Sequence, residues 1–171
     1  MKNEYLHRYY SGFRDALYEA LDFESLEEAD DVALRTSIDN FVNNHIVTNN
    51  ISVSSEIAKK ISYYLFCDIT GLGFLEDLLQ DVTISEIMVN GKDDIFIERK
   101  GKVVKSDIQF VSEDQLLGVA KNIANKVGRK VDSSTPLCDA RLLDGSRVNI
   151  VIPPIGLNGT TITIRKFKKT V

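Results

Sequence analysis

The sequence contains no tryptophan and has only two cysteines and two histidines among its 171 residues. Cys67 and Cys138 stand alone, without Cys-x-x-Cys spacing, which excludes a disulfide framework and a zinc site built on such pairs. His7 and His45 have no second ligand at metal-binding spacing. We therefore predict no metal site and no catalytic residue, and we expect both cysteines to be buried, reduced thiols.

Long apolar runs are also absent. No run approaches the about 20 residues that a membrane-spanning helix needs, and the first residues lack the apolar stretch of a secretory signal. The net charge of -4 and the isoelectric point near 5.2 argue against sequence-independent binding of nucleic acid or anionic lipid. We expect a cytoplasmic protein that binds no nucleic acid. The length and the 43% of hydrophobic residues suit one ordinary domain or a domain with a helical extension.

A phosphate-binding loop of the form G-x-x-x-x-G-K-[ST] is missing as well. Gly-Lys pairs begin only at Gly91 and Gly101, and neither has the preceding glycine or the following Ser or Thr. That loop cradles phosphates with its backbone amides and reaches them with its lysine. The chain alone therefore offers no such site for ATP and magnesium.

Residues 1–70 have a helical period of apolar residues. We predict helices over about 3–21, from about Asp30 to Asn49, and from an N-cap at Ser54 to a stop near Gly71. The expected inward-facing residues are Tyr5, Tyr9, Phe13, Ala16, Leu17, Ala20, Leu21, Leu34, Ile38, Phe41, Val42, Ile46, Ile57, Ile61 and Leu65. Mutual packing in a small helical bundle or arm explains this pattern better than docking to a partner.

From Leu72 onward the pattern changes to a short helix followed by strands. We predict strands over 87–90, 95–99 and 102–108, a helix from the Ser112 and Gln115 capping box to about Val127, and strands over 139–143, 146–152 and 160–167. This order predicts an α+β fold, in which an N-terminal helical region precedes an antiparallel sheet packed with helices.

The last strands carry Arg141, Arg147 and Arg165. Asp144-Gly145 predicts a two-residue hairpin turn, which brings these arginines close together at a sheet edge. Each guanidinium offers a planar fork of donors that matches the oxygens of a phosphate. Alternatively, Arg141 pairs with Asp139 or Asp144 across the hairpin, and the other two are exposed strand charges that contribute little.

The ordered motifs of this region resemble a known family. Asp139-Ala140-Arg141-Leu142, then the segments 144–149, 152–154 and Thr163-Ile164-Arg165, follow the signature of the amino-terminal domain of type II/type IV secretion ATPases, with the CpaF (Tad/Flp pilus-assembly) branch as the nearest likeness. Upstream, the segments 78–79, 85–91, 97–99 and 128–129 also fit, so the resemblance covers roughly 71–168.

The resemblance implies a PAS-like domain over 71–168 and the start of an interdomain linker at 169–171, within a longer polypeptide whose motor domain follows. In that full-length protein, ATP and magnesium are the cofactors. Arg147 and Arg165, with Arg141 as a weaker third, contact the terminal phosphates. The implied partners are the chain's own C-terminal motor domain, identical subunits in a hexamer, and platform proteins of the inner membrane, so the protein works at the cytoplasmic face of that membrane. On its own, this part is inactive.

A second interpretation is a natural stand-alone PAS-like sensor or adaptor that binds a small ligand or a protein. A phosphate loop encoded shortly after Val171 favours the secretion ATPase, whereas a stop codon there favours the sensor. The sequence leaves open the exported substrate and the partner of the helical region.

Overall fold

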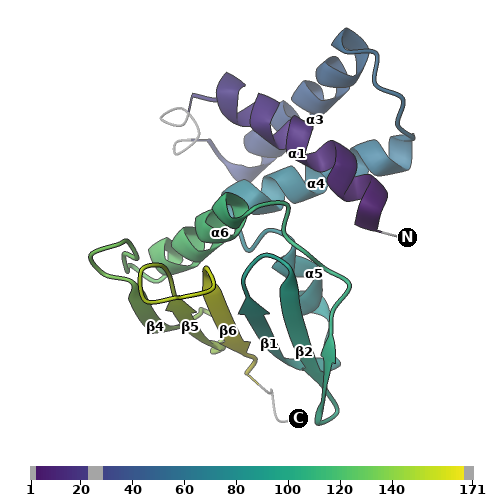
Figure 1. Cartoon of the computed structure of the whole chain (residues 1–171). Coiled ribbons are helices and arrows are strands. Elements are labelled where there is room, and N and C mark those ends of the chain that lie inside the picture. The colour runs from purple at the N-terminus through teal and green to yellow at the C-terminus, as the bar shows by residue number, and fades with distance from the viewer. Residues whose placement is uncertain (1–2, 23–28, 168–171) are drawn as a thin grey trace. The chain divides into compact units, whose positions relative to one another are not determined.

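The apolar repeat in the first part of the chain forms helices α1 (Asn3–Ala20), α3 (Asp31–Thr48) and α4 (Ser55–Thr70) (Figure 1). The computed structural model describes residues 3–22 and 29–167, and the chain folds as two compact units, Met1–Ile69 and Thr70–Val171. The second unit holds the sheet, so the predicted α+β class is confirmed. The linker predicted at 169–171 lies outside the described residues, and the PAS-like assignment of 71–168 stays a prediction.

Helix α1 buries a face that is rotated from the predicted one. Phe13 and Leu17 are buried as expected, but the other buried positions are Leu6 and Tyr10. Ala20 is exposed, and the side chain of Tyr5 is outside the described part. Positions 6, 10, 13 and 17 are spaced by four, three and four residues and form one helical stripe of larger apolar side chains.

Local capping explains where the other two helices begin. The Asp30 carboxylate accepts a hydrogen bond from the Ala33 amide at 2.7 Å, and the Ser54 hydroxyl accepts one from the Ile57 amide at 3.2 Å. Most of the inward-facing residues predicted for these two helices are buried in the core of the first unit: Leu34, Ile38, Val42, Ile61 and Leu65. The other three, Phe41, Ile46 and Ile57, are half-buried.

A buried carboxylate joins α1 to α4. Asp68 is 4% exposed and accepts hydrogen bonds from the Tyr10 hydroxyl and from Nε of Arg14, each at 2.9 Å. Burial, reinforced by the charge of Asp68, raises the pKa of Tyr10 well above its usual value, so the hydroxyl remains a donor. The same two causes raise the pKa of Tyr18, over which Arg14 lies, to about 12.

The second unit contains one six-stranded antiparallel sheet in the order β3-β2-β1-β6-β5-β4. The strands are β1 (Ile84–Asn90), β2 (Asp94–Arg99), β3 (Lys102–Lys105), β4 (Leu137–Arg141), β5 (Arg147–Val151) and β6 (Thr161–Arg165), and the helices are α5 (Leu75–Gln80) and α6 (Glu113–Lys126). Strand β3 ends at Lys105 rather than at the predicted residue 108, and the Ser106 amide still continues its pairing with β2 by donating to the Ile95 carbonyl at 2.7 Å.

Alternation along the strands separates a buried face from an open one. Ile162 and Ile164 of β6 are buried, while Thr163 is half-buried and Arg165 exposed on the other side. Helix α6 lies across the sheet in Figure 1, and its buried residues complete the core. The buried residues of the sheet are Ile84, Ile87, Val89, Ile95, Ile97, Cys138, Val148, Ile150, Ile162 and Ile164. As expected, Cys67 and Cys138 are buried, and among the described residues neither forms a disulfide bond.

The β4–β5 turn differs from the predicted two-residue turn. The Gly145 amide donates to the Leu142 carbonyl at 2.9 Å, and Gly145 has a φ of +90°, so Leu143, Asp144 and Gly145 form a three-residue loop. A two-residue turn would pair Leu143 with Ser146 and put Arg141 and Arg147 on opposite faces. The observed loop pairs Arg141 with Arg147 on the same face.

The capping box at the start of α6 also differs in detail. The Ser112 hydroxyl accepts from the Gln115 amide at 3.1 Å, as predicted. The side-chain oxygen of Gln115, however, accepts from the Val111 amide at 2.8 Å instead of the Ser112 amide.

The helices of residues 3–22 and 29–167 include none with the length and hydropathy of a membrane-spanning segment.

The β5–β6 connection folds tightly on itself, which leads to a prediction. A Cβ on Gly156 would stand 2.3 Å from the carbonyl oxygen of Gly159, whereas a Cβ on Gly118 in α6 would meet nothing within 4 Å. We expect Gly156→Ala to lower the free energy of unfolding by about 2 kcal/mol, because backbone must move. The matched change Gly118→Ala should raise it by about 0.5 kcal/mol. Urea denaturation checks both, and equal effects would contradict the crowding in this loop.

Candidate functional site

The open face of the sheet carries three arginines in a cross-strand row. Arg141 on β4 pairs in register with Arg147 on β5, which pairs with Arg165 on β6. Residues directly opposite in an antiparallel pair project from the same face. The predicted proximity of these arginines is therefore present, and all three side chains are exposed.

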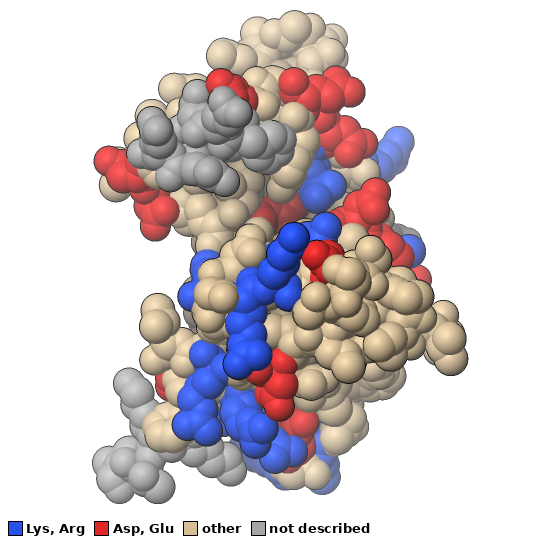
Figure 2. Space-filling model, turned by 90° about the vertical axis from the view of Figure 1, so that its left-hand side faces the viewer, with Lys and Arg blue, Asp and Glu red and all other residues tan. Residues whose placement is uncertain are grey.

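The row changes sign where it crosses onto the other half of the sheet. Arg165 is in register with Glu86 on β1, and Glu86 is in register with Glu98 on β2. Figure 2 shows Lys and Arg side chains gathered in a band in the lower part of that view, with Asp and Glu beside them. The positive side of the row is thus suited to an anion, in a protein whose overall charge is negative.

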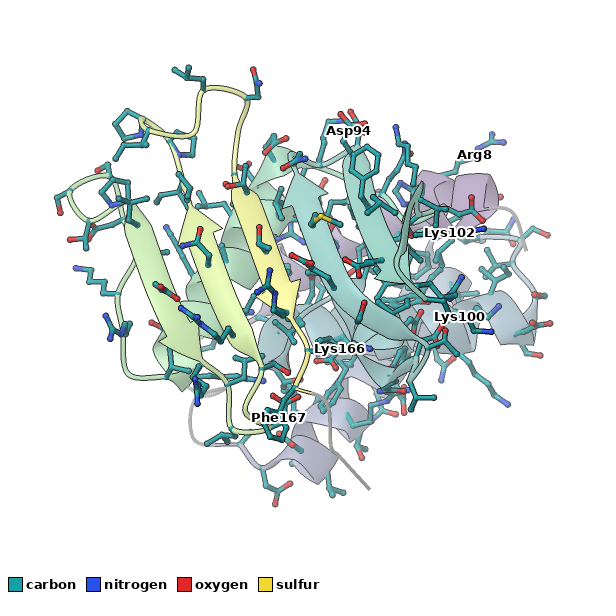
Figure 3. All side chains as sticks on the ribbon, turned by 90° about the horizontal axis from the view of Figure 1, so that it is seen from below. Arg8, Asp94, Lys100, Lys102, Lys166 and Phe167 are labelled. Atoms are coloured by element: carbon teal, nitrogen blue, oxygen red, sulfur yellow. The ribbon has the colours of Figure 1, made fainter. Side chains whose placement is uncertain are left out.

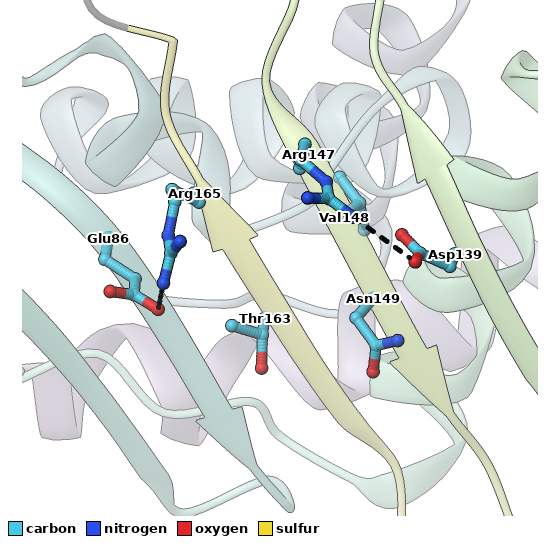
Figure 4. Close-up of a pocket in the computed structure, with 7 residues that line it drawn as sticks. All are labelled: Glu86, Asp139, Arg147, Val148, Asn149, Thr163 and Arg165. Carbon is cyan, nitrogen blue, oxygen red and sulfur yellow. Dashed lines mark ion pairs between the residues drawn. The ribbon is translucent and has the colours of Figure 1, made fainter.

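Arg147 and Arg165 line a shallow, open hollow of about 240 Å³ (Figure 4). A second cross-strand row, Asp139–Asn149–Thr163, follows the arginines along the strands and supplies an amide and a hydroxyl. The residues around the hollow are Glu86, Asp139, Arg147, Val148, Asn149, Thr163 and Arg165. Two guanidiniums next to neutral polar groups can bind a group with several anionic oxygens.

Among the described residues, Arg147 and Arg165 make only long ionic contacts. Nη2 of Arg147 lies 3.5 Å from Oδ2 of Asp139, and Nη2 of Arg165 lies 3.9 Å from Oε1 of Glu86, while their side chains are 63% and 73% exposed. These distances exceed those of charge-assisted hydrogen bonds. Within residues 3–22 and 29–167, neither guanidinium donates a hydrogen bond, so the donor forks of Arg147 and Arg165 remain available.

Arginines with a structural role are held differently in this protein. Arg99 donates to Asp81 at 2.9 Å and to Thr83 at 2.8 Å, and Arg14 donates to Asp68 at 2.9 Å. The guanidiniums of Arg99 and Arg14 thus make short hydrogen bonds that stabilise the fold, whereas, in the described part of the chain, those of the arginine row do not. The alternative pairing of Arg141 is not present in the described residues, because Asp139 faces Arg147 and Asp144 accepts from the Ser146 amide at 2.8 Å.

The end of β6 is fixed next to the site. Nζ of Lys166 donates to the Asp81 carbonyl at 2.6 Å, and Phe167 follows at the end of the strand (Figure 3). Partial burial lowers the pKa of Lys166, and the charges of Asp81 and Asp144 oppose this shift without reversing it.

Hydrogen bonds from Thr83, then Arg99, lower the pKa of Asp81 from 3.8 to about 2. The carboxylate therefore stabilises the fold above pH 3.8, and this contribution is lost as the pH falls toward 2.

Sequence reasoning missed the acidic half of this site. Glu86 has no evident partner in the sequence, which favours a solvated charge, yet it lies beside Arg165. Alternation predicts that Glu86 shares a face with Met88, but the pairing of β1 with β6 joins two segments that are far apart in the sequence. No group of three or more metal-binding side chains is present among the described residues. The phosphate role of Arg147, Arg165 and Arg141 stays a prediction.

Comparison with known proteins identifies relatives of the sheet unit. The sequence model of the family described as "Type II/IV secretion system protein" matches residues 68–171. The crystal structure of the VirB11 ATPase from the Brucella suis type IV secretion system, in complex with sulphate, matches with a TM-score of 0.50 and 30% identity, covering 57% of this chain and 31% of that one.

Sequence relatives extend the same likeness. An uncharacterized protein of Methanocaldococcus jannaschii is 39% identical over 111 residues, which are 64% of this chain and 15% of that protein. A putative conjugal transfer protein of Mycobacterium tuberculosis is 27% identical over 107 residues, or 59% of this chain and 30% of that protein. The type IV secretion system protein VirB11 of Bartonella quintana is 30% identical over 99 residues, with coverages of 57% and 28%. The chain spans between 15% and 30% of the length of these relatives.

Proposed function

Because the chain belongs to the type II/IV secretion system protein family, we propose that it is the amino-terminal, nucleotide-clamping region of a secretion ATPase. The observation that carries the proposal is the in-register row of arginines whose guanidiniums are exposed and, within the described residues, make no hydrogen bond. Such a row costs the fold like-charge repulsion between neighbouring strands. A bound polyphosphate offsets that repulsion.

Arg147 and Arg165 meet the terminal phosphates of a nucleotide held by a following motor domain, and Arg141 is a weaker third contact. The phosphate loop that this sequence lacks would belong to the following motor domain, where it would hold ATP and magnesium. Guanidinium donors stabilise the charge that develops on the terminal phosphate. Because the contact is lost with that phosphate, closure of this region over the nucleotide follows the nucleotide state.

The finer identity of the machine is part of the same proposal. The ordered motifs along β1 and β4–β6 support the CpaF branch, which assembles Tad/Flp pili. On this basis the chain is part of a longer ATPase, works as a homo-hexamer with its own C-terminal motor domain, and meets platform proteins at the cytoplasmic face of the inner membrane. The isolated chain is a monomer or weak dimer without ATPase activity.

The length of the native polypeptide tests this proposal first. Intact mass measured from the source cells, read with the codons that follow Val171, should reveal a much longer product with a G-x-x-x-x-G-K-[ST] loop, and that product should hydrolyse ATP. A product that ends near Val171 and has no ATPase activity would overturn the clamp. It would favour the stand-alone sensor or adaptor instead.

A further inference from the structure

Arg147 and Arg165 each have one carboxylate as a neighbour. Figure 4 shows Asp139 beside Arg147 and Glu86 beside Arg165, on opposite sides of the hollow. The acids come from β4 and β1, the strands that flank β5 and β6, which carry Arg147 and Arg165. The open face therefore brackets its basic centre with negative charge.

These carboxylates lower the positive potential of the hollow without using the donors of the arginines. At 3.5 and 3.9 Å they are close enough for a Coulomb interaction but too far for a good hydrogen bond. The side chain of Glu86 is only 19% exposed, compared with 61% for Asp139. Water screens the charge of Glu86 less, so Glu86 has the stronger influence on its arginine.

The fold itself gains little from the carboxylate of Glu86. Its directly opposite neighbour on β2 is Glu98, and like charges at opposed positions are unfavourable. Its partner Arg165 is 73% exposed, and ion pairs with such exposure add little to stability. The attraction to Arg165 and the repulsion from Glu98 partly offset each other, so a neutral side chain of the same shape at position 86 should change the stability of the sheet little.

We propose that the carboxylates of Glu86 and Asp139 compete with a bound phosphate for the guanidiniums of Arg165 and Arg147, and that this competition keeps the affinity of the arginine row for phosphate modest. The inference rests on the phosphate role proposed above for Arg147 and Arg165. When no phosphate is present, the carboxylates compensate the arginines. When a phosphate enters, it displaces these long contacts, and once hydrolysis has cleaved the terminal phosphate from the nucleotide the carboxylates again compete with it for the guanidiniums. They thereby favour release.

Binding of inorganic tripolyphosphate to the whole chain tests this inference. The variants are Glu86→Gln, Asp139→Asn and their combination, and Glu98→Gln is the control because it removes the same charge from the same face one strand further away. Titrations followed by NMR of the arginine Nε–H groups give the affinity at low and physiological salt. We expect Glu86→Gln to tighten binding about threefold and Asp139→Asn about twofold, with Glu98→Gln changing it less than about 1.5-fold.

The possible results separate this inference from the proposed function. Tripolyphosphate binding that is lost in Arg147→Ala/Arg165→Ala but unchanged or weakened in Glu86→Gln would overturn the competitor role and keep the phosphate site. An equal gain in Glu98→Gln and Glu86→Gln would also overturn it, because net charge would then explain the gain. Absence of binding to the wild-type chain and to Glu86→Gln, or binding unaffected by loss of both arginines, would overturn the phosphate site itself.

Discussion

In the full-length ATPase proposed above, replacing Arg147 and Arg165 together with alanine should lower ATP turnover by about 100-fold. Loss of a single well-placed donor to transition-state charge costs on the order of 100-fold, and the two guanidiniums act on the same phosphate, so their effects overlap. Steady-state ATP hydrolysis by the purified parent protein measures this effect. The fold should be unchanged, because both side chains are exposed and, in the described part, make no hydrogen bond.

Two further variants sharpen this experiment. Arg147→Lys keeps the charge but loses the planar fork, so turnover should remain well below wild type. Lys102→Ala removes an exposed cation from β3 at the opposite side of the sheet, and it should leave turnover unchanged. Wild-type turnover in both single alanine variants would end the assignment. A matching loss in Lys102→Ala would point to overall charge instead of phosphate contact.

Removing the buried carboxylate of the helical unit should cause the largest loss of stability. We expect Asp68→Ala to lower the free energy of unfolding of that unit by about 3 kcal/mol, because Nε of Arg14 and the Tyr10 hydroxyl both lose an acceptor at 2.9 Å. The Arg14 side chain is only 16% exposed, so water replaces the carboxylate poorly. Urea denaturation followed by circular dichroism in the far ultraviolet reports on these helices.

The matched control lies on the same helix. Glu56 and Lys60 of α4 form an exposed pair at 3.5 Å, one turn apart, and Glu56→Ala should cost no more than about 0.5 kcal/mol. If Asp68→Ala costs as little as Glu56→Ala, the carboxylate is not the acceptor that holds α1 to α4. A similar loss in Arg14→Ala would support a shared network, since the two changes break the same contact.

The order of helices and strands could be predicted from the sequence because it depends on local signals. The caps at Asp30, Ser54 and Ser112 and the period-two alternation of β6 are each contained in a few neighbouring residues. The exact face of α1 could not, because Tyr5 and Tyr9 define a stripe nearly as apolar as that of Leu6 and Tyr10. Only packing against the other helices distinguishes the two.

The site was predictable in part for the same reason. Arg141 and Arg147 lie on one hairpin, so the local turn signal predicts that they are near each other in space. The two-residue turn predicted from Asp144-Gly145 would nevertheless put them on opposite faces, and only the observed three-residue loop puts them on the same face. The contact between Glu86 and Arg165 depends on β1 and β6 being neighbours in the sheet. That non-local pairing has no signature in either segment, and so the acidic half of the site became visible only in three dimensions.

The two outermost strands of the sheet also determine how copies of the chain can associate. Strand β3 is short and has a lysine at each end, and β4 carries Asp139 and Arg141 along the opposite edge. Short, charged edges resist strand addition, the route by which exposed sheets join into aggregates. In the hexamer proposed above, we therefore expect subunits to meet through side-chain surfaces and not through a continuous sheet, so that neighbours could shift without breaking backbone hydrogen bonds between them.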